Sequence, residues 1–378
     1  MTESEAFIYC KQLATSHYEN FHVASFFLPK PLRQPFYIVY AYCRCSDDLA
    51  DEHDGSPQSR QRAWQRLNDW QQQLDQCFRQ EGFGQADFGQ TAPDTMPNKG
   101  THPVFIALRW LIRHYALPKE PFADLLVAFR QDQTQQGYAT FEELLGYCRY
   151  SANPVGRIVL HLIGNPHSCN TYNRPRVLDS APSINNQSIN NQSTNKHFPL
   201  LHSLRQSWRT LRLHPLFFNR KERKDFTKRN VHLLTRHNIG SGIPTPEQLS
   251  WSDSICTALQ LANFWQDVRR DKAAGRCYIP QDVAQKFGVD LTDLHDSPEF
   301  RRMIQELVAD ARSRFHAGKS LVETVPKKLR KDISLFIRGG LAILDAIERI
   351  QFNVLEERPA LSRWIKLRLL LGLGNPFS

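Results

Sequence analysis

The chain has 378 residues, of which 41% are apolar, and a mean hydropathy of −0.50, values typical of a folded protein with a large core. No stretch approaches the roughly 20 consecutive apolar residues that a membrane-spanning helix needs. The start of the chain also lacks the basic residues and apolar run of a secretory signal. The eight cysteines show no CxxC spacing, so we expect free thiols in a reducing compartment and a cytoplasmic protein.

The net charge of +10 would suit a nucleic-acid-binding protein, but it is concentrated in one segment. Between Asn170 and Ser250 there are thirteen Lys/Arg and four Asp/Glu, so the rest of the chain is nearly neutral. The same segment contains a direct repeat of SINNQ, which has too little apolar surface to offset the entropy of ordering it. We therefore predict a surface insertion over about residues 168–252 and no nucleic-acid partner. An amphipathic helix that contacts anionic lipid is the alternative for its basic part.

A second, shorter loop rich in Gly, Gln and Asp is predicted over about residues 80–101. Outside both segments the sequence has the periodicity of helices and no convincing strand alternation. We predict an all-α bundle around a central cavity, formed by one domain over 1–378 that the two segments interrupt. The predicted helices are Ala6–His17, Pro35–Glu52, Gln58–Phe78, Val104–Tyr115, Pro121–Asp132, Thr140–Tyr150, Pro154–Ile163, Ser252–Lys272, Phe300–Val322, Lys328–Leu355 and Leu361–Leu371.

Two of these helices carry clusters of oxygen-bearing side chains. The first ends in DDLADE, with Asp47 and Asp51 four residues apart and Asp48 between them. The second places Asn263, Asp267 and Asp271 at i, i+4 and i+8, on one face of an otherwise apolar helix. A solvated helix end is the alternative for the first cluster. Carboxylates on an apolar helix need compensation, and Mg²⁺ bound by a few carboxylates and a diphosphate would compensate both clusters.

With these motifs the sequence resembles the squalene and phytoene synthases, which are head-to-head isoprenoid synthases. DDLAD and NFWQDVRRD are similar to the two aspartate-rich motifs of that family, and GRCYIP after the second motif fits its continuation. YCRYSANPVGRIV, from Tyr147 to Val159, is similar to the segment that lines the family's cavity. His17, Phe21, Tyr40 and Arg44 precede Asp47 at the family's offsets, and Gln260 precedes Asn263.

Within the family, SHYENFHVASFFLPKPLR and ALQLANFWQDV most resemble the hydroxysqualene synthases of bacterial hopanoid biosynthesis. The resemblance implies that presqualene diphosphate loses diphosphate and the rearranged cation captures water, without NADPH. The alternatives are a presqualene diphosphate, squalene or phytoene synthase that condenses two prenyl diphosphates, or an inactive assembly or binding protein of the same fold. Many relatives carry Arg where this chain has Gln266; one fewer cation suits an enzyme that performs only the second half-reaction.

The resemblance also implies roles for individual residues. The ligands of Mg²⁺, or of Mn²⁺ in its place, would be Asp47, Asp51, Asn263, Asp267 and Asp271, with Asp48 as a supporting carboxylate. Diphosphate contacts would come from Arg44, Arg149 and Arg276, for which ordinary ion pairs are the alternative. Tyr40 and Tyr147 would stabilise a carbocation through their rings or simply pack in the core, and His17 and Gln260 would contact the substrate.

The C-terminal stretch RPALSRWIKLRLLLGLGNPF mixes Arg and Lys with Trp, Ile and Leu. We expect it to cap the helical core. The alternative is a peripheral contact with the inner face of the membrane, which would help an enzyme whose substrate has a C30 tail. Companion enzymes of hopanoid biosynthesis are the implied protein partners.

Overall fold

The computed structural model describes residues 1–16, 30–51, 56–79, 100–135, 137–164 and 243–370. In this part of the chain all regular secondary structure is helical, which confirms the predicted all-α class. The helices in chain order are α1 (Glu3–Ser16), α3 (Lys30–Asp51), α4 (Pro57–Arg79), α5 (Pro103–Tyr115), α6 (Glu120–Gln131), α7 (Phe141–Ser151), α8 (Asn153–Gly164), α11 (Pro246–Ala273), α12 (Gln281–Phe287), α13 (Pro298–Gly318), α14 (Leu321–Thr324), α15 (Lys327–Arg349) and α16 (Arg363–Leu370). None of them is both long and apolar enough to cross a membrane.

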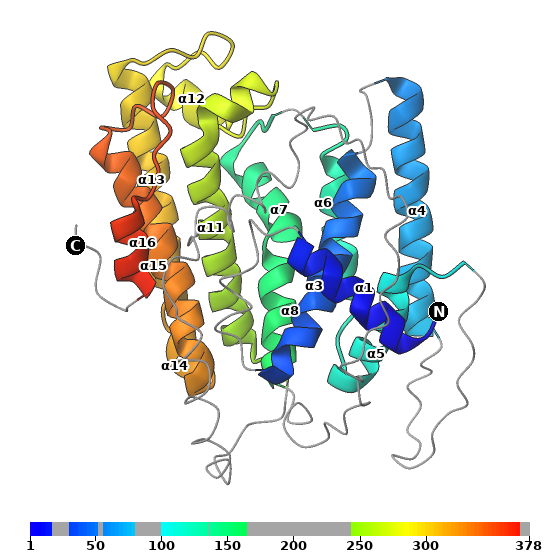
Figure 1. The fold of residues 1–378 in the computed structure, drawn as a ribbon. Helices are drawn as coiled ribbons and strands as arrows, with labels where there is room; N and C mark the ends of the chain where they lie inside the picture. The colour runs from blue at the N-terminus through cyan, green and yellow to red at the C-terminus, as the bar shows by residue number, and fades with distance from the viewer. Residues whose placement is uncertain (17–29, 52–55, 80–99, 136, 165–242, 371–378) are drawn as a thin grey trace.

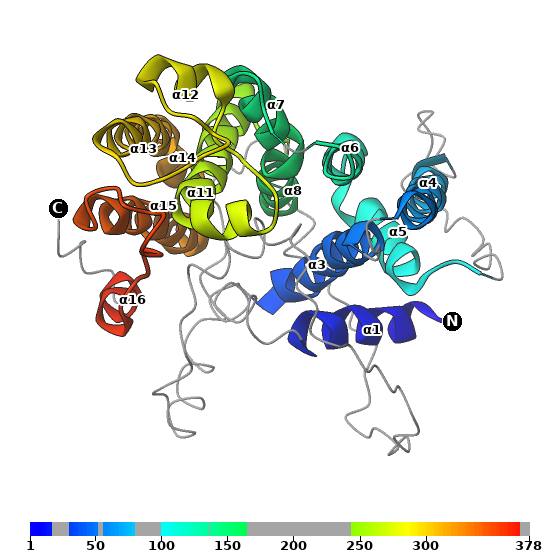
Figure 2. The ribbon, with the colours of Figure 1, turned by 90° about the horizontal axis from the view of Figure 1, so that it is seen from above.

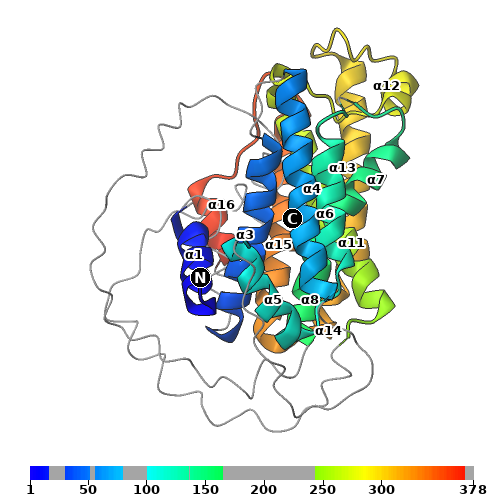
Figure 3. The same cartoon turned by 90° about the vertical axis from the view of Figure 1, so that its right-hand side faces the viewer.

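The long helices run roughly side by side as a bundle, and α11 is its hub (Figure 1). Helix α11 packs against α7, α8, α13 and α15, while α3 packs against α1, α4, α5 and α6. Seen down the bundle, α6, α7 and α8 connect these two groups on one side (Figure 2). From the side, α4 covers the outer face of α3 and α6 (Figure 3). Helices α3 and α11 are therefore placed relative to each other through α6, α7 and α8.

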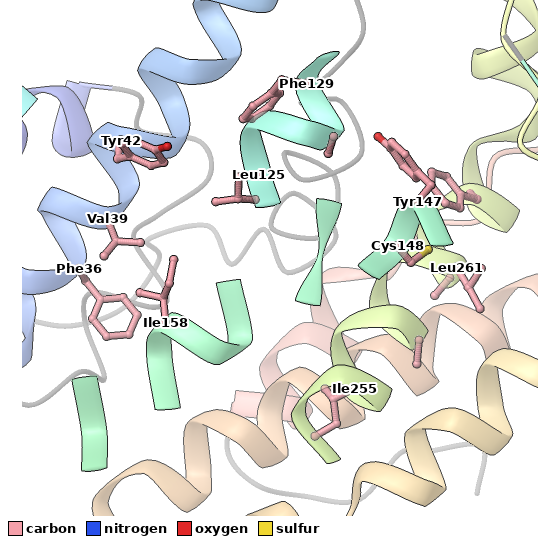
Figure 4. Close-up of a cluster of buried hydrophobic side chains, with 14 of the residues drawn as sticks. Phe36, Val39, Tyr42, Leu125, Phe129, Tyr147, Cys148, Ile158, Ile255 and Leu261 are labelled. Carbon is pink, nitrogen blue, oxygen red and sulfur yellow. The ribbon is translucent and has the colours of Figure 1, made fainter. Parts of the chain in front are cut away.

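Buried side chains on these connecting helices form the core between the two groups (Figure 4). Phe36 and Val39 of α3 lie on one side of it, and Ile255 and Leu261 of α11 lie on the other. Helices α8 and α11 approach closely because Gly156 has no side chain: a Cβ atom there would lie 2.6 Å from the Cys256 sulfur. This close contact is one of the interfaces that place α11 in the bundle.

Helix α11 begins at Pro246, six residues before the predicted start at Ser252. Thr245 and Gln248 form a capping box, in which each side chain accepts a hydrogen bond from the other residue's backbone N–H, at 3.3 and 3.0 Å. Proline directly after the cap suits the first helical position. The helical pattern therefore extends into the last residues of the predicted insertion, whose other residues from 168 to 242 lie outside the described part.

Other elements also differ from the sequence prediction, including α3, which begins at Lys30 rather than at Pro35. Helix α12 was not predicted, because its seven residues are too few to show a period. The predicted helix Phe300–Val322 is two helices, α13 and α14, separated after Gly318. Helix α15 ends at Arg349 rather than near Leu355, because Gln351 and Phe352 have φ values of 52° and 62° that a right-handed helix cannot contain.

Candidate functional site

The first aspartate cluster lies in the last two turns of α3. Asp47 is fully buried, whereas the side chain of Asp48 is 40% exposed. Arg44 lies between them: its guanidinium contacts both oxygens of Asp48, at 2.9 and 2.5 Å, and is 4.0 Å from Asp47. Burial alone would lower the pKa of Arg44, but the charges of Asp48 and Asp47 outweigh it and raise that pKa. Arg44 thus forms the ion pair that was the alternative to a diphosphate contact, within one helix, and the diphosphate contact stays a prediction.

The end of α3 is held by hydrogen bonds from neighbouring helices. Trp70 of α4 donates its indole N–H to the Ser46 hydroxyl at 2.8 Å, directly beside Asp47. Gln133, just after α6, donates its side-chain amide to the Ala50 carbonyl at 3.0 Å. Both Ser46 and Gln133 are buried, so these bonds are shielded from water. They fix the backbone that carries the first motif.

The second cluster lies in the last three turns of α11. Gln260, Asn263 and Asp267 are all buried, with Asp267 only 2% exposed. Arg358, which follows α15, binds Asp267 through both carboxylate oxygens, at 2.6 and 3.3 Å, and Arg270 lies 3.8 Å away. A guanidinium from a residue 91 positions later in the chain therefore binds this carboxylate.

Asp271 lies one turn further along α11 and is half-buried. Its pKa is raised from 3.8 to about 8, first by burial and then by the negative charge of Asp267, and the cations of Arg276, Arg270 and Arg358 offset this only in part. A carboxyl group with this pKa binds a proton where no metal is present, and a divalent cation would favour its ionised form. A cavity of about 310 Å³ lies beside Asp271, and Arg276 and Tyr278 are among its lining residues.

Aromatic side chains gather beside Arg276, near α7, which packs against both α6 and α11. The Tyr147 hydroxyl donates to Asp132 at 3.1 Å, and its ring is packed against those of Tyr138, Tyr278 and Phe264, with centroids 5.8 to 6.3 Å apart. Phe264 stacks on Tyr278 at 4.0 Å. Burial raises the pKa of Tyr147 far above its usual value, and the nearby Asp132 charge raises it further. Phe264 and Tyr278 of this aromatic group also line the cavity beside Asp271.

The two clusters lie at the same end of the bundle, because α3 and α11 both run toward it and carry their aspartates in their last turns (Figure 1). The described structure joins Arg44, Asp47 and Asp48 in one group and Asp267, Asp271 and Arg276 in another. Tyr40 is half-buried one turn before Arg44, and burial raises its pKa to about 12. Arg149 is exposed on α7, where its charge partly offsets the burial that raises the pKa of Asp124.

Two predicted site residues cannot be placed: His17 and the side chain of Asp51 lie outside the described residues. Within the part that is described, no group of three His, Cys, Asp or Glu side chains is arranged to hold a metal ion by itself. Each cluster instead offers two carboxylates, and Asn263 adds an amide oxygen on α11. Such a donor set, made of oxygen atoms alone, fits a hard divalent cation that takes its remaining ligands from a diphosphate.

Four residues of the site were not predicted from the sequence: Asp132, Tyr138, Tyr278 and Arg358. Tyr278 lies within GRCYIP, so its motif was a usable signal. No local pattern marks Arg358, because only folding brings it to Asp267. Gln266, expected to leave the second motif short of one cation, is buried and donates its amide to the Pro359 carbonyl at 2.6 Å. Arg358 supplies a guanidinium at the neighbouring Asp267, so Gln266 alone does not decide the number of cations there.

The chain is similar to known proteins over nearly its full length. A hydroxysqualene synthase from Sinorhizobium fredii is 31% identical over 362 residues, which cover 94% of this chain and 87% of that protein. A 15-cis-phytoene synthase from Synechococcus elongatus is 24% identical over 367 residues, covering 96% and 91%. The crystal structure of squalene synthase HpnC from Alicyclobacillus acidocaldarius has a TM-score of 0.63 and 31% identity, covering 93% of this chain and 96% of that one. A sequence model described as squalene/phytoene synthase matches residues 14–183 and 227–365, and the chain therefore belongs to the squalene/phytoene synthase family.

Proposed function

We propose that this enzyme converts presqualene diphosphate and water to hydroxysqualene and diphosphate. The observation that carries the proposal is the 31% identity to a hydroxysqualene synthase over 94% of this chain and 87% of that protein. Condensation of two prenyl diphosphates, as in a phytoene synthase, is the alternative. Both reactions break a carbon–oxygen bond to a diphosphate, so they share the need for positive charge around the leaving group.

The proposed cofactor is Mg²⁺, with Mn²⁺ as a substitute. The side chains that would hold it are Asp47, Asp51, Asn263, Asp267 and Asp271. When bound, such a cation would act as a Lewis acid on the diphosphate oxygens. The burial of Asp47 and Asp267 supports this assignment, because buried carboxylates need nearby cations.

The protein's own groups would guide the rest of the reaction. As the carbon–oxygen bond breaks, its electron pair leaves with the diphosphate, and the guanidinium groups of Arg44 and Arg276 would bind the released oxygens. The carbocation would lie against π faces such as that of Tyr147. Water then adds to the rearranged cation, and its proton passes to the released diphosphate or to bulk water. Because nothing is oxidised or reduced in these steps, no NADPH is required.

The test is incubation of the purified protein and Mg²⁺ with presqualene, farnesyl or geranylgeranyl diphosphate, each with and without NADPH. Hydroxysqualene formed from presqualene diphosphate alone is the expected result. Presqualene diphosphate formed from farnesyl diphosphate, or phytoene formed from geranylgeranyl diphosphate, would overturn the proposal. Asp47→Asn and Asp267→Asn should each abolish product formation, and normal rates in either would contradict the metal assignment.

A peripheral membrane contact is proposed for the outer face of α16. Ile365 and Leu369 of this helix are buried against the core, as expected for a cap, but Trp364 is 76% exposed. Tryptophan beside basic residues favours the interface of an anionic bilayer. Co-sedimentation with phosphatidylglycerol vesicles should therefore weaken in Trp364→Ala, and equal binding by both proteins would exclude this face.

A further inference from the structure

The segment Glu356–Pro359, which follows α15, lies along the last turns of α11 and is tied to it by three side chains. Gln266 donates its amide to the Pro359 carbonyl at 2.6 Å, and Arg269 donates its guanidinium to the Glu356 carbonyl at 2.7 Å. The third tie is the bond from Arg358 to Asp267. The two hydrogen bonds to backbone carbonyls therefore lie on either side of Arg358 in the sequence.

The three ties differ in what would break them. The bonds from Gln266 and Arg269 end on backbone carbonyls, which carry no net charge and do not compete with a metal ion for a carboxylate. The Arg358 bond ends on Asp267, the carboxylate that a divalent cation would bind under the proposed function. Metal binding would therefore displace the guanidinium from Asp267 but leave both carbonyl ties in place.

The Gln266 tie is the better shielded of the two carbonyl ties. Gln266 is 2% exposed, whereas the Arg269 bond is open to solvent. A hydrogen bond inside a protein is stronger than one in contact with water, and loss of its donor leaves a buried carbonyl unsatisfied. Pro359 adds stiffness, because its ring restricts φ and removes one backbone degree of freedom.

We propose that Gln266 is a positioning residue that, with Arg269, holds Arg358 at the second aspartate cluster when a metal ion occupies Asp267. The displaced guanidinium then binds oxygens of the metal-bound diphosphate instead of swinging into solvent. A guanidinium matches phosphate oxygens as it matches a carboxylate, with paired N–H donors. The identity of this ligand rests on the proposed function, whereas the positioning of Arg358 rests on the three contacts.

The variants for the test are Gln266→Met, Arg269→Met, Arg358→Met and the double variant Gln266→Met/Arg358→Met. Gln266→Met removes the donor and keeps the length of the side chain. The matched control is Arg330→Met, which removes contacts to the carbonyls of Glu323 and Val325 in the α14–α15 connection, outside the proposed site. Hydrogen exchange of peptides covering 350–362 reports the segment, and calorimetric titration with inorganic diphosphate in the presence of Mn²⁺ reports the ligand.

In Gln266→Met, amides of the segment should exchange faster, and diphosphate should bind about tenfold more weakly, as expected for one buried hydrogen bond. Arg269→Met should show the same changes to a smaller extent, which keeps the test valid if Gln266→Met does not fold. Arg330→Met should match the wild type in both measurements. Because Gln266 acts through Arg358, the double variant should bind diphosphate no more weakly than Arg358→Met alone.

The proposal would be overturned if Gln266→Met bound diphosphate as tightly as the wild type. It would also be overturned if adding Gln266→Met to Arg358→Met weakened diphosphate binding by the same factor as in the wild type. Neither measurement uses a prenyl substrate, so a wild-type protein that makes phytoene would refute the proposed function and leave this inference standing. Conversely, hydroxysqualene formation by the wild type together with unchanged binding in Gln266→Met would refute only the positioning role. If the wild type does not bind diphosphate with Mn²⁺, both are wrong.

Discussion

Replacing Arg358 and replacing Asp267 should change the free energy of unfolding by very different amounts. Arg358→Met removes the guanidinium that lies 2.6 Å from the Asp267 carboxylate, which is 2% exposed, and keeps Arg270 at 3.8 Å. Breaking a fully buried ion pair in this way costs about 3–5 kcal/mol. The side chain of Arg358 is 34% exposed, so solvent screens the pair and we expect a smaller loss, about 1–3 kcal/mol in the free energy of unfolding.

Asp267→Asn removes the buried charge itself. The guanidinium of Arg358 keeps its charge, but it already reaches solvent and can be hydrated there. We therefore expect a change within about 1 kcal/mol, although this variant should be inactive. The double variant Asp267→Asn/Arg358→Met lacks the buried charge of Asp267 as well as the guanidinium, so its free energy of unfolding should exceed that of Arg358→Met.

Added Mg²⁺ gives a second, independent test, because the ion and Arg358 would compete for the Asp267 carboxylate. In the wild type the ion must compete with Arg358 for Asp267, whereas in Arg358→Met this competing guanidinium is absent. Since a ligand stabilises the folded state according to its concentration relative to its Kd, Mg²⁺ alone should raise the free energy of unfolding more in Arg358→Met. Urea denaturation with and without MgCl₂ measures both effects. An Asp267→Asn variant at least as destabilised as Arg358→Met, or equal stabilisation by Mg²⁺ in both proteins, would refute the reasoning.

Three further predictions concern other parts of the bundle. A Cβ atom on Gly340 would overlap the Phe315 ring, so Gly340→Ala should lower the free energy of unfolding by about 1–3 kcal/mol, and Phe315→Leu in that background should restore part of it, as measured in urea. Burial raises the pKa of Asp332 to about 6, so the folded state binds its proton more tightly and stability falls as pH rises from about 4 to 6. Asp332→Asn should then be more stable by about 1–2 kcal/mol near neutral pH and no more stable near pH 3.5; a gain that persists at low pH would contradict this origin. Tyr147→Phe, which loses only the bond to Asp132, should keep turnover within about tenfold, whereas Tyr147→Leu should slow it about thirtyfold, and equal rates would exclude a role for the ring.

The sequence predicted the helical class and both aspartate clusters because each is encoded locally. A helix places residues four apart on one face, so Arg44 and Asp48, or Asp267 and Asp271, can be related without knowledge of the fold. The same reasoning places Tyr147 on α7 but says nothing of Asp132, its hydrogen-bond partner. That contact depends on how α6 and α7 pack, which the periodicity of either helix does not specify.

The boundaries that were missed have local causes of two kinds. The residues of the capping box, Thr245 and Gln248, can be recognised in the sequence. They were not assigned to a helix because they fell within the predicted polar insertion. The end of α15 was not visible, because Phe352 takes a left-handed conformation that its residue type disfavours. After that turn the chain runs back to the last turns of α11.

The two aspartate clusters obtain their cations in different ways, and this affects how each would respond to a metal ion. Arg44 belongs to the same helix as Asp47 and Asp48, so loss of that pairing changes one side chain and leaves the backbone of α3 fixed by Trp70 and Gln133. Arg358 comes from a segment whose position depends on α11. A metal ion at Asp267 would therefore replace the hydrogen bond from Arg358, and the bonds from Gln266 and Arg269 would keep the segment in position. For this reason we expect diphosphate affinity to depend on the C-terminal segment at the second cluster and to be independent of it at the first.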